Sequence, residues 1–280
     1  MKEREFSMLI LSLTKHYEKI NWIEKWEEIS RLLYEFGVYI NSVSFRTISD
    51  RKIYSFYIKR RDSKEKFLRE LNARRDDIGI IDLDFFEKNT HEYSGISLSS
   101  ENYYITGYIT IRTVLNCGSY LNQKWNSKEK FSLFKLYISE LQNCGFEIIA
   151  SNSYFFPARL HPDCIIKGIF VELRDGYKDA YQHSSYINKV IKSNSSYRKP
   201  TLFLLSNFNA IKYSSPALEV LQESLAEDAV FLDSSSEIIF FELGDDEHYS
   251  IIELMKTELY KNLYNKLVKM NLLNEYYEAK

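Results

Sequence analysis

The chain has 280 residues, of which only nine are Gly and four are Pro, and its formal net charge is -2. Average usage would give roughly 34 Gly and Pro together, so collagen-like repeats, Gly/Ser linkers and Pro-rich disorder are excluded. The two closest glycines, Gly168 and Gly176, are eight residues apart. Dinucleotide-binding loops, P-loops and nucleophile elbows all need two glycines within about five residues. The sequence therefore excludes a phosphate-binding glycine loop of known spacing, and we expect no cofactor.

Aromatic residues make up 15% of the chain and hydrophobic residues 45%, which is ample material for a buried core. No uncharged stretch approaches the ~18 residues that span a bilayer, and the charges of 2–5 cancel, unlike those of a signal peptide. The spacing of Cys117, Cys144 and Cys164 fits neither a disulfide framework nor a metal site, so they are expected to be buried thiols. We expect a cytoplasmic bacterial protein without a membrane partner.

The first half of the chain alternates helical and extended patterns. Phe6, Leu9, Ile10 and Leu13 have helical spacing and predict a short amphipathic helix. A second helix, at 22–36, is expected to end at Gly37, the residue type that best adopts a left-handed C-terminal conformation. The remaining elements predicted here are strands at 38–47 and 52–59, a helix at 63–74, and strands at 78–85 and 103–115.

The pattern then restarts, with a helix at 127–144 that ends at Gly145 and leads into the apolar 146–150. Gly37 and Gly145 are 108 residues apart, and the residues around them match in type. Duplication of an α-β-β-α-β unit is one explanation; the alternative is that helices closed by Gly are common in unrelated proteins. The remaining predictions are strands at 164–173 and 201–206 around a helix at 177–192, a helix beginning at Pro216, strands at 229–233 and 237–243, and a helix at 249–271.

Strand pairs that alternate with helices predict an α+β fold, in which helices pack on largely antiparallel sheets. The restart divides the chain into an N-terminal α+β half at 1–120 and a C-terminal α+β half at 121–280, the second ending in a long helix. The sequence leaves the oligomeric state open.

Charge is strongly segregated along the chain. The segment 46–75 holds eleven Lys or Arg and four Asp or Glu, a local net charge of +7. Its cations could bind the phosphates of a nucleic acid, with neighbouring aromatic residues stacking on bases. The alternative is a solvated helix face whose cations pair with nearby acids. The candidate nucleic-acid residues are Lys59, Arg60, Arg61, Arg74 and Arg75.

The segment 219–258 holds twelve acids and one Lys, a local net charge of -11. One interpretation is a solubilising rim whose carboxylates also favour a helix N-terminus. The other is an acidic surface that docks a basic protein, because complementary charge speeds and orders association. The candidate partner-binding residues are Asp228, Asp233, Glu237, Glu242, Asp245, Asp246 and Glu247.

Catalytic signatures are weak. The five histidines are never closer than 22 residues to one another, so no paired zinc spacing is present. Asp82 and Asp84 alternate along a predicted strand and form an alternative metal site, although such pairs usually face water or cap a turn. No family resemblance can be tied to a motif.

The sequence favours a non-catalytic interaction protein that binds a basic partner through its acidic C-terminal third. An immunity protein or inhibitor that neutralises a toxin is the most specific form of this hypothesis. Two alternatives stay open. One is a nucleic-acid-binding or nuclease-like defence or processing protein that uses the basic 46–75 segment. The other is a small-molecule sensor or enzyme with an aromatic pocket.

Overall fold

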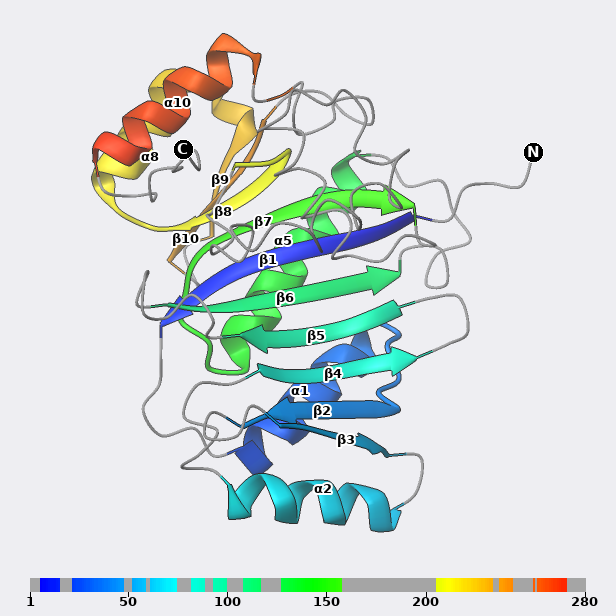
Figure 1. The fold of residues 1–280 in the computed structure, drawn as a ribbon. Coiled ribbons are helices and arrows are strands. Elements are labelled where there is room, and N and C mark those ends of the chain that lie inside the picture. The colour runs from blue at the N-terminus through cyan, green and yellow to red at the C-terminus, as the bar shows by residue number, and fades with distance from the viewer. Residues whose placement is uncertain are drawn as a thin grey trace, which may run out of the picture.

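A computed structural model of the chain describes residues 6–15, 22–47, 52–58, 61–74, 82–88, 93–99, 108–116, 127–157, 205–233, 237–243, 254 and 256–270. Ten strands form one sheet in the order β3-β2-β4-β5-β6-β1-β7-β8-β10-β9, and every neighbouring pair is antiparallel (Figure 1). The fold is therefore α+β, as predicted. The strands are β1 (Phe6–Lys15), β2 (Ser42–Arg46), β3 (Ile53–Tyr57), β4 (Asp82–Lys88), β5 (Tyr93–Ser99), β6 (Tyr108–Asn116), β7 (Ile148–Pro157), β8 (Phe208–Lys212), β9 (Val230–Asp233) and β10 (Ile238–Glu242).

The first element is a strand, so the predicted N-terminal helix is wrong. β1 lies in the middle of the sheet between β6 and β7. Its neighbours Leu9 and Ile10 are both fully buried although successive strand residues point to opposite faces. A strand that is buried on both faces needs an unbroken apolar run, and such a run satisfies helical spacing as well. The sheet is thus continuous across 1–120 and 121–280 through β1.

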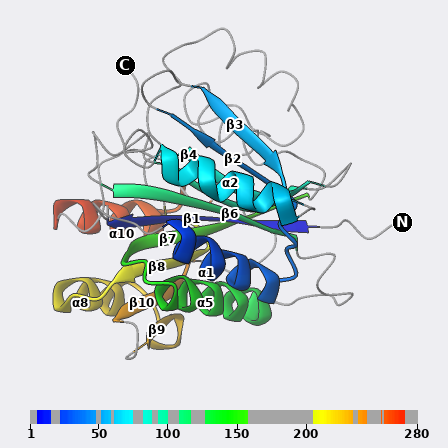
Figure 2. The same ribbon diagram turned by 90° about the horizontal axis from the view of Figure 1, so that it is seen from below.

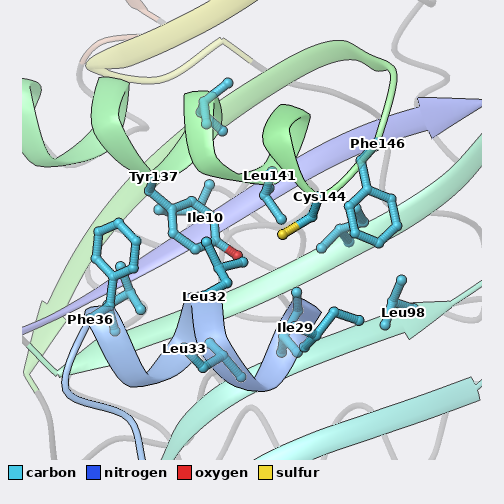
Figure 3. Packing of buried hydrophobic residues seen from close by; sticks show 14 of the residues in the cluster. Ile10, Ile29, Leu32, Leu33, Phe36, Leu98, Tyr137, Leu141, Cys144 and Phe146 are labelled. Atoms are coloured by element: carbon cyan, nitrogen blue, oxygen red, sulfur yellow. The ribbon is translucent and has the colours of Figure 1, made fainter. Parts of the chain in front are cut away.

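One face of the sheet is covered by α1 (Trp22–Glu35), α2 (Arg61–Ala73) and α5 (Ser127–Asn143). These helices share one hydrophobic cluster, to which β1 contributes Met8 and Ile10. Figure 1 shows α1 and α5 behind the strands, and in Figure 2 they lie side by side. At their contact Phe36 packs edge-on against Tyr137 with ring centroids 5.2 Å apart, and Figure 3 shows the two rings next to each other near Leu32. The cluster under α1, α2 and α5 forms the larger part of the hydrophobic core.

α1 and α5 end in the same way. Gly37 and Gly145 have φ of 73° and 79°, the left-handed conformation that glycine adopts without steric cost. Val38 N–H donates to Leu33 O at 2.9 Å, and Phe146 N–H donates to Leu141 O at 3.1 Å. Each glycine N–H also donates to the carbonyl three residues earlier, at 3.0 Å and 2.7 Å. Both termini are therefore Schellman motifs, which confirms the predicted helix stops; the duplication itself stays a prediction.

A second hydrophobic cluster lies on the opposite face, at the β8-β10 end, under α8 (Ser215–Ser224) and α10 (Glu258–Lys269). Alternation along β10 separates the clusters, because Phe240 belongs to the first and Phe241 to the second. Ser214 is the N-cap of α8 and accepts from the Ala217 N–H at 3.3 Å, with Pro216 in the first turn as predicted. Among the helices in the described ranges, none combines the length and apolarity needed to cross a membrane.

Polar side chains are buried where β1, β7 and β8 meet. Ser151 Oγ donates to Leu11 O at 3.0 Å, so Ser12 Oγ is the donor in its 2.7 Å contact with Ser151 Oγ. The Asn209 side chain donates to Ser206 O at 2.6 Å and accepts from Ser206 N–H at 2.8 Å. A register slip between β1 and β7 would leave Ser12 and Ser151 unsatisfied, so this pair helps to specify the strand pairing, whereas the Ser206–Asn209 bonds are local.

The other predicted elements have mixed outcomes. β3, β4, β6, β7, β9, β10, α2 and α5 agree with predicted elements to within several residues, whereas β2 forms only the end of a longer predicted strand. β5 was not predicted, and β8 begins after the predicted strand at 201–206. The predicted strand at 164–173 and helix at 177–192 lie outside the described residues, and only part of the 249–271 helix lies inside them.

Candidate interaction surfaces at the two ends of the sheet

β9 is the last strand at the acidic end of the sheet and pairs with β10 on one side only. Glu237 O accepts from the Tyr213 N–H at 2.7 Å, which shows that Glu237 and every second residue after it direct their backbone groups toward β8. The intervening residues of β10 therefore face β9, where Phe240 pairs with Phe231. By the same alternation, the N–H and C=O of Val230 and Leu232 point to the outer side of β9, away from β10.

The side chains of this edge are exposed and apolar. Phe231 is 45% exposed and Leu232 is 41% exposed. Phe231 also contacts Phe240 with ring centroids 6.2 Å apart, so it is anchored on the core while showing half its surface to solvent. Lys135 Nζ lies 4.2 Å from the Phe231 ring centroid. An exposed apolar strand edge is a surface that proteins normally cover.

Three of the predicted acidic residues flank this strand, and we call Asp228, Phe231, Leu232, Asp233 and Glu237 together the β9 corner. Asp228 lies in the single turn Glu227–Ala229 before β9 and is exposed. Asp233 is the last residue of β9. Glu237 is exposed at the turn into β10 and has a left-handed φ of 51°. The corner thus combines acids with an open apolar edge.

The other predicted acids lie elsewhere. Glu242 is the last residue of β10, an interior strand, and its backbone is opposite Phe208. Asp245, Asp246 and Glu247 lie outside the described residues. Lysines of α10 also offset part of the acidic segment, as Lys266 Nζ lies 3.3 Å from Glu223 Oε2 and Lys261 Nζ 3.1 Å from Glu258 Oε1. In the described part of the segment, the β9 corner combines exposed acids with the two exposed apolar residues of an edge strand.

The basic end of the sheet has β3 as its last strand. Thr47 N–H donates to Lys52 O at 3.1 Å and Ile58 N–H to Asn41 O at 3.0 Å. Even-numbered residues from 52 to 58 therefore direct their backbone groups toward β2, and those of Ile53, Ser55 and Tyr57 point outward. Ile53 is 58% exposed and Tyr57 is 51% exposed. Among the described strands, none pairs with the outer side of β3 or β9.

Arg74 is the candidate nucleic-acid residue whose side chain the structure describes. Arg74 forms an ion pair with Glu70 and lies over the Tyr54 ring at 4.5 Å, and a hydrogen bond with Tyr54 raises the pKa of its guanidinium. Tyr54 and Phe56 pack against the core, so they are not available to stack on bases. Arg61 is the first residue of α2. Lys59, Arg60 and Arg75 lie outside the described residues.

The alternative metal pair lies on β4. Asp84 is opposite Ser44 on β2 and Ser97 on β5, and Asp82 is opposite Ser99. Within the described ranges, no three His, Cys, Asp or Glu side chains lie close enough together to hold a metal ion. The metal role of Asp82 and Asp84 stays a prediction.

A partly buried cluster links α1 to the C-terminus of α5. Lys25 Nζ donates to the Cys144 carbonyl and to Glu28 Oε2, the latter at 2.6 Å, and lies 5.4 Å from the Phe146 ring centroid. A cation there complements the negative end of the helix dipole. Burial, with the charge of Glu28, raises the pKa of the Cys144 thiol to about 11. Cys144 is thus a buried thiol, as predicted; Cys117 and Cys164 lie outside the described residues.

Sequence reasoning did not identify the two open edges. The IYSFY sequence of β3 shows the alternation of a half-buried strand. However, whether a strand lies at an edge depends on pairing between distant segments. No local signal marks Phe231 or Ile53 as exposed, because the same residue types fill the core.

No protein-family model and no curated protein matches the chain. Among solved structures, the chain is similar to the Pseudomonas aeruginosa T6SS protein PA0821, with a TM-score of 0.45 and 11% sequence identity. The similarity covers 94% of this chain and 72% of that one. A likeness at this level assigns neither a function nor a partner to the chain.

Proposed function

We propose that the protein is a non-catalytic interaction module that binds a basic protein partner through the β9 corner. The observation that carries the proposal is the coincidence, on one open strand, of the exposed apolar Phe231 and Leu232 with flanking Asp228, Asp233 and Glu237. Aromatic anchors surrounded by polar groups are the usual arrangement of strong protein interfaces. The more specific form is an immunity protein or inhibitor that neutralises a basic toxin.

This surface should bind an extended segment of the partner protein that carries Lys or Arg at its ends. The outward N–H and C=O of Val230 and Leu232 can pair with the backbone of an added strand, which supplies affinity. The acids select for positive charge and increase the association rate. Because the corner is exposed, its electrostatic contribution should weaken as salt rises.

The test compares two charge reversals of equal size. One variant carries Asp228→Lys, Asp233→Lys and Glu237→Lys at the β9 corner. The control carries Glu27→Lys, Glu35→Lys and Glu65→Lys, which are exposed acids of α1 and α2. Proteins captured from the native host by wild-type chain are identified by mass spectrometry, and each is then purified and titrated against all three chains.

We expect a basic protein to bind the wild type and the control, and to lose at least about tenfold in affinity with the corner variant, a change of about 1.4 kcal/mol. Equal binding by the corner variant and the wild type would reject this surface. Capture of a nucleic acid in place of a basic protein would favour the basic 46–75 segment.

A further inference from the structure

The two ends of the sheet are chemically complementary to each other. The open edge of β3 lies in the segment of net charge +7, and the open edge of β9 lies in the segment of net charge -11. Exposed Arg46 and Lys52 flank β3, whereas exposed Asp228 and Glu237 flank β9. We propose that the β3 edge binds the β9 edge of a second copy of this chain, so that copies associate head to tail through a continuous sheet.

Strand direction permits this association. The ten strands alternate in direction across nine antiparallel pairings, so β3 and β9 run in opposite directions. When a second copy is added without turning its sheet over, its β3 therefore lies antiparallel to β9 of the first copy. An odd number of strands would have produced a parallel junction, which is slightly less stable per residue.

The side chains of the outward residues also lie on the same face of the sheet at both edges. On β3 the residues with outward backbone groups are Ile53, Ser55 and Tyr57, and their side chains point away from the first hydrophobic cluster, which Tyr54 and Phe56 contact. On β9 the outward residues are Val230 and Leu232, which are opposite Phe241 and Ile239 of the second cluster. The two clusters lie on opposite faces of the sheet. Both sets of outward residues thus share one face, as a hydrogen-bonded antiparallel pair requires.

The same features select against symmetric dimers. Pairing of β3 with β3 would join two edges that both lie in the segment of net charge +7, and pairing of β9 with β9 would join two edges in the segment of net charge -11. Like charges across a junction oppose such pairing. A head-to-tail contact joins unlike surfaces and does not close after two copies, so it continues into longer assemblies.

The association shares the β9 corner with the proposed function but does not depend on it. A basic partner on β9 would occupy the surface that the next copy needs, and would therefore end the growing chain. Self-association and partner capture are expected to compete.

The test uses one proline on each edge. Ser55→Pro removes an outward N–H of β3, and Leu232→Pro removes one of β9; neither N–H serves an internal pairing, and proline is tolerated at strand edges. Each variant alone should be a 33.3 kDa monomer by sedimentation velocity. An equimolar mixture should form dimers of twice that mass and nothing larger, because each variant retains the edge that the other lacks.

Wild-type chain should form species above the dimer, and these should diminish between about 0.1 M and 1 M salt as the Debye length falls from ~10 Å to ~3 Å. Ile53→Glu with Tyr57→Glu gives a second probe that leaves the backbone intact. Its control, Leu136→Glu with Tyr34→Glu, replaces one aliphatic and one Tyr side chain by Glu at exposed positions of α5 and α1. Circular dichroism checks that each variant is folded.

A wild-type chain that stays monomeric at low salt would overturn the inference. So would a mixture of the proline variants that fails to dimerise while the wild type associates, or a Glu control that dissociates as fully as the β3 variant. A monomeric chain that still loses its basic partner on reversal of the β9 corner would leave the proposed function intact and reject self-association alone.

Discussion

Thr113 on β6 and Tyr137 on α5 form a hydroxyl pair between the sheet and the helix that covers it. Their oxygens are 2.5 Å apart and both side chains are fully buried. Burial raises the pKa of Tyr137 above its ordinary value, so the phenol stays protonated and can donate. The pair satisfies two polar groups inside an otherwise apolar cluster.

Removal of one member should cost more than removal of both. We expect Tyr137→Phe or Thr113→Val to lower the free energy of unfolding by about 1–3 kcal/mol, because each leaves a buried hydroxyl without this partner. The double variant should lose clearly less than the sum of the two losses. Urea denaturation of the four chains measures the coupling; strict additivity would show that the contact contributes nothing.

Cys144 gives a pH dependence with a defined sign. The pKa of its thiol is raised from 9.0 to about 11 in the folded chain, so the folded state holds this proton more tightly than the unfolded state. The associated stability is present below pH 9 and is lost as pH rises from about 9 to 11. Unfolding free energies across this range should therefore fall more steeply for wild type than for Cys144→Ala. Parallel curves would contradict the assignment.

At the scale of elements, the matched termini of α1 and α5 place glycines where a side chain is strained. An ideal Cβ on Gly145 would lie 3.0 Å from Lys25 Nζ, in addition to the positive φ. Gly145→Ala should lower the free energy of unfolding by about 1–2 kcal/mol. Gly145→Asn should cost less, because Asn tolerates the left-handed region better. Thermal denaturation of the two variants measures both losses of stability. Equal losses for Ala and Asn would mean that backbone strain is not the cause.

The helices were the most predictable elements. α1 and α5 combine apolar periodicity with a Gly stop, and both signals lie within the element itself. The helix predicted at β1 is wrong because burial on both faces removes the alternation of apolar and polar residues that identifies a strand. β5 was missed because Gly95 and its serines have low strand propensity and are held by β4 and β6.

The candidate site was predictable in its charge and not in its position. The acidic segment is visible in the sequence; Asp228 precedes β9, and Asp233 and Glu237 lie at the other end of this strand. Glu242 lies on an interior strand, and only the strand order reveals that. Local patterns cannot identify the last strand of a sheet, because that property depends on every other pairing.

At the scale of the whole molecule, β1 joins the two predicted halves. It pairs with β6 on one side and with β7 on the other, and the main hydrophobic cluster draws on both 1–120 and 121–280. Expressed separately, the two segments should each expose a row of unpaired strand groups together with part of this cluster. A fragment in that state should not unfold cooperatively.

We therefore expect neither 1–120 nor 121–280 to show a cooperative thermal transition by circular dichroism, and co-expression of the two to restore one. Exchange protection of β1 amides should likewise appear only in the reconstituted pair. If either fragment folds alone with native-like protection, the halves are independent domains, and the junction at β1 is an interface between them.

The central position of an N-terminal strand also shapes how the protein is made. β1 is synthesised before both of its neighbours, and β6 and β7 follow roughly 100 and 140 residues later. At a synthesis rate of about 5–20 residues per second, this apolar segment waits on the order of 5–30 seconds for its two neighbours. During that interval it is a free strand with no core to enter. β1 is deeply buried in the folded sheet, but during synthesis it is the segment most exposed to aggregation. The yield of the protein in cells should therefore depend strongly on chaperones that bind nascent chains.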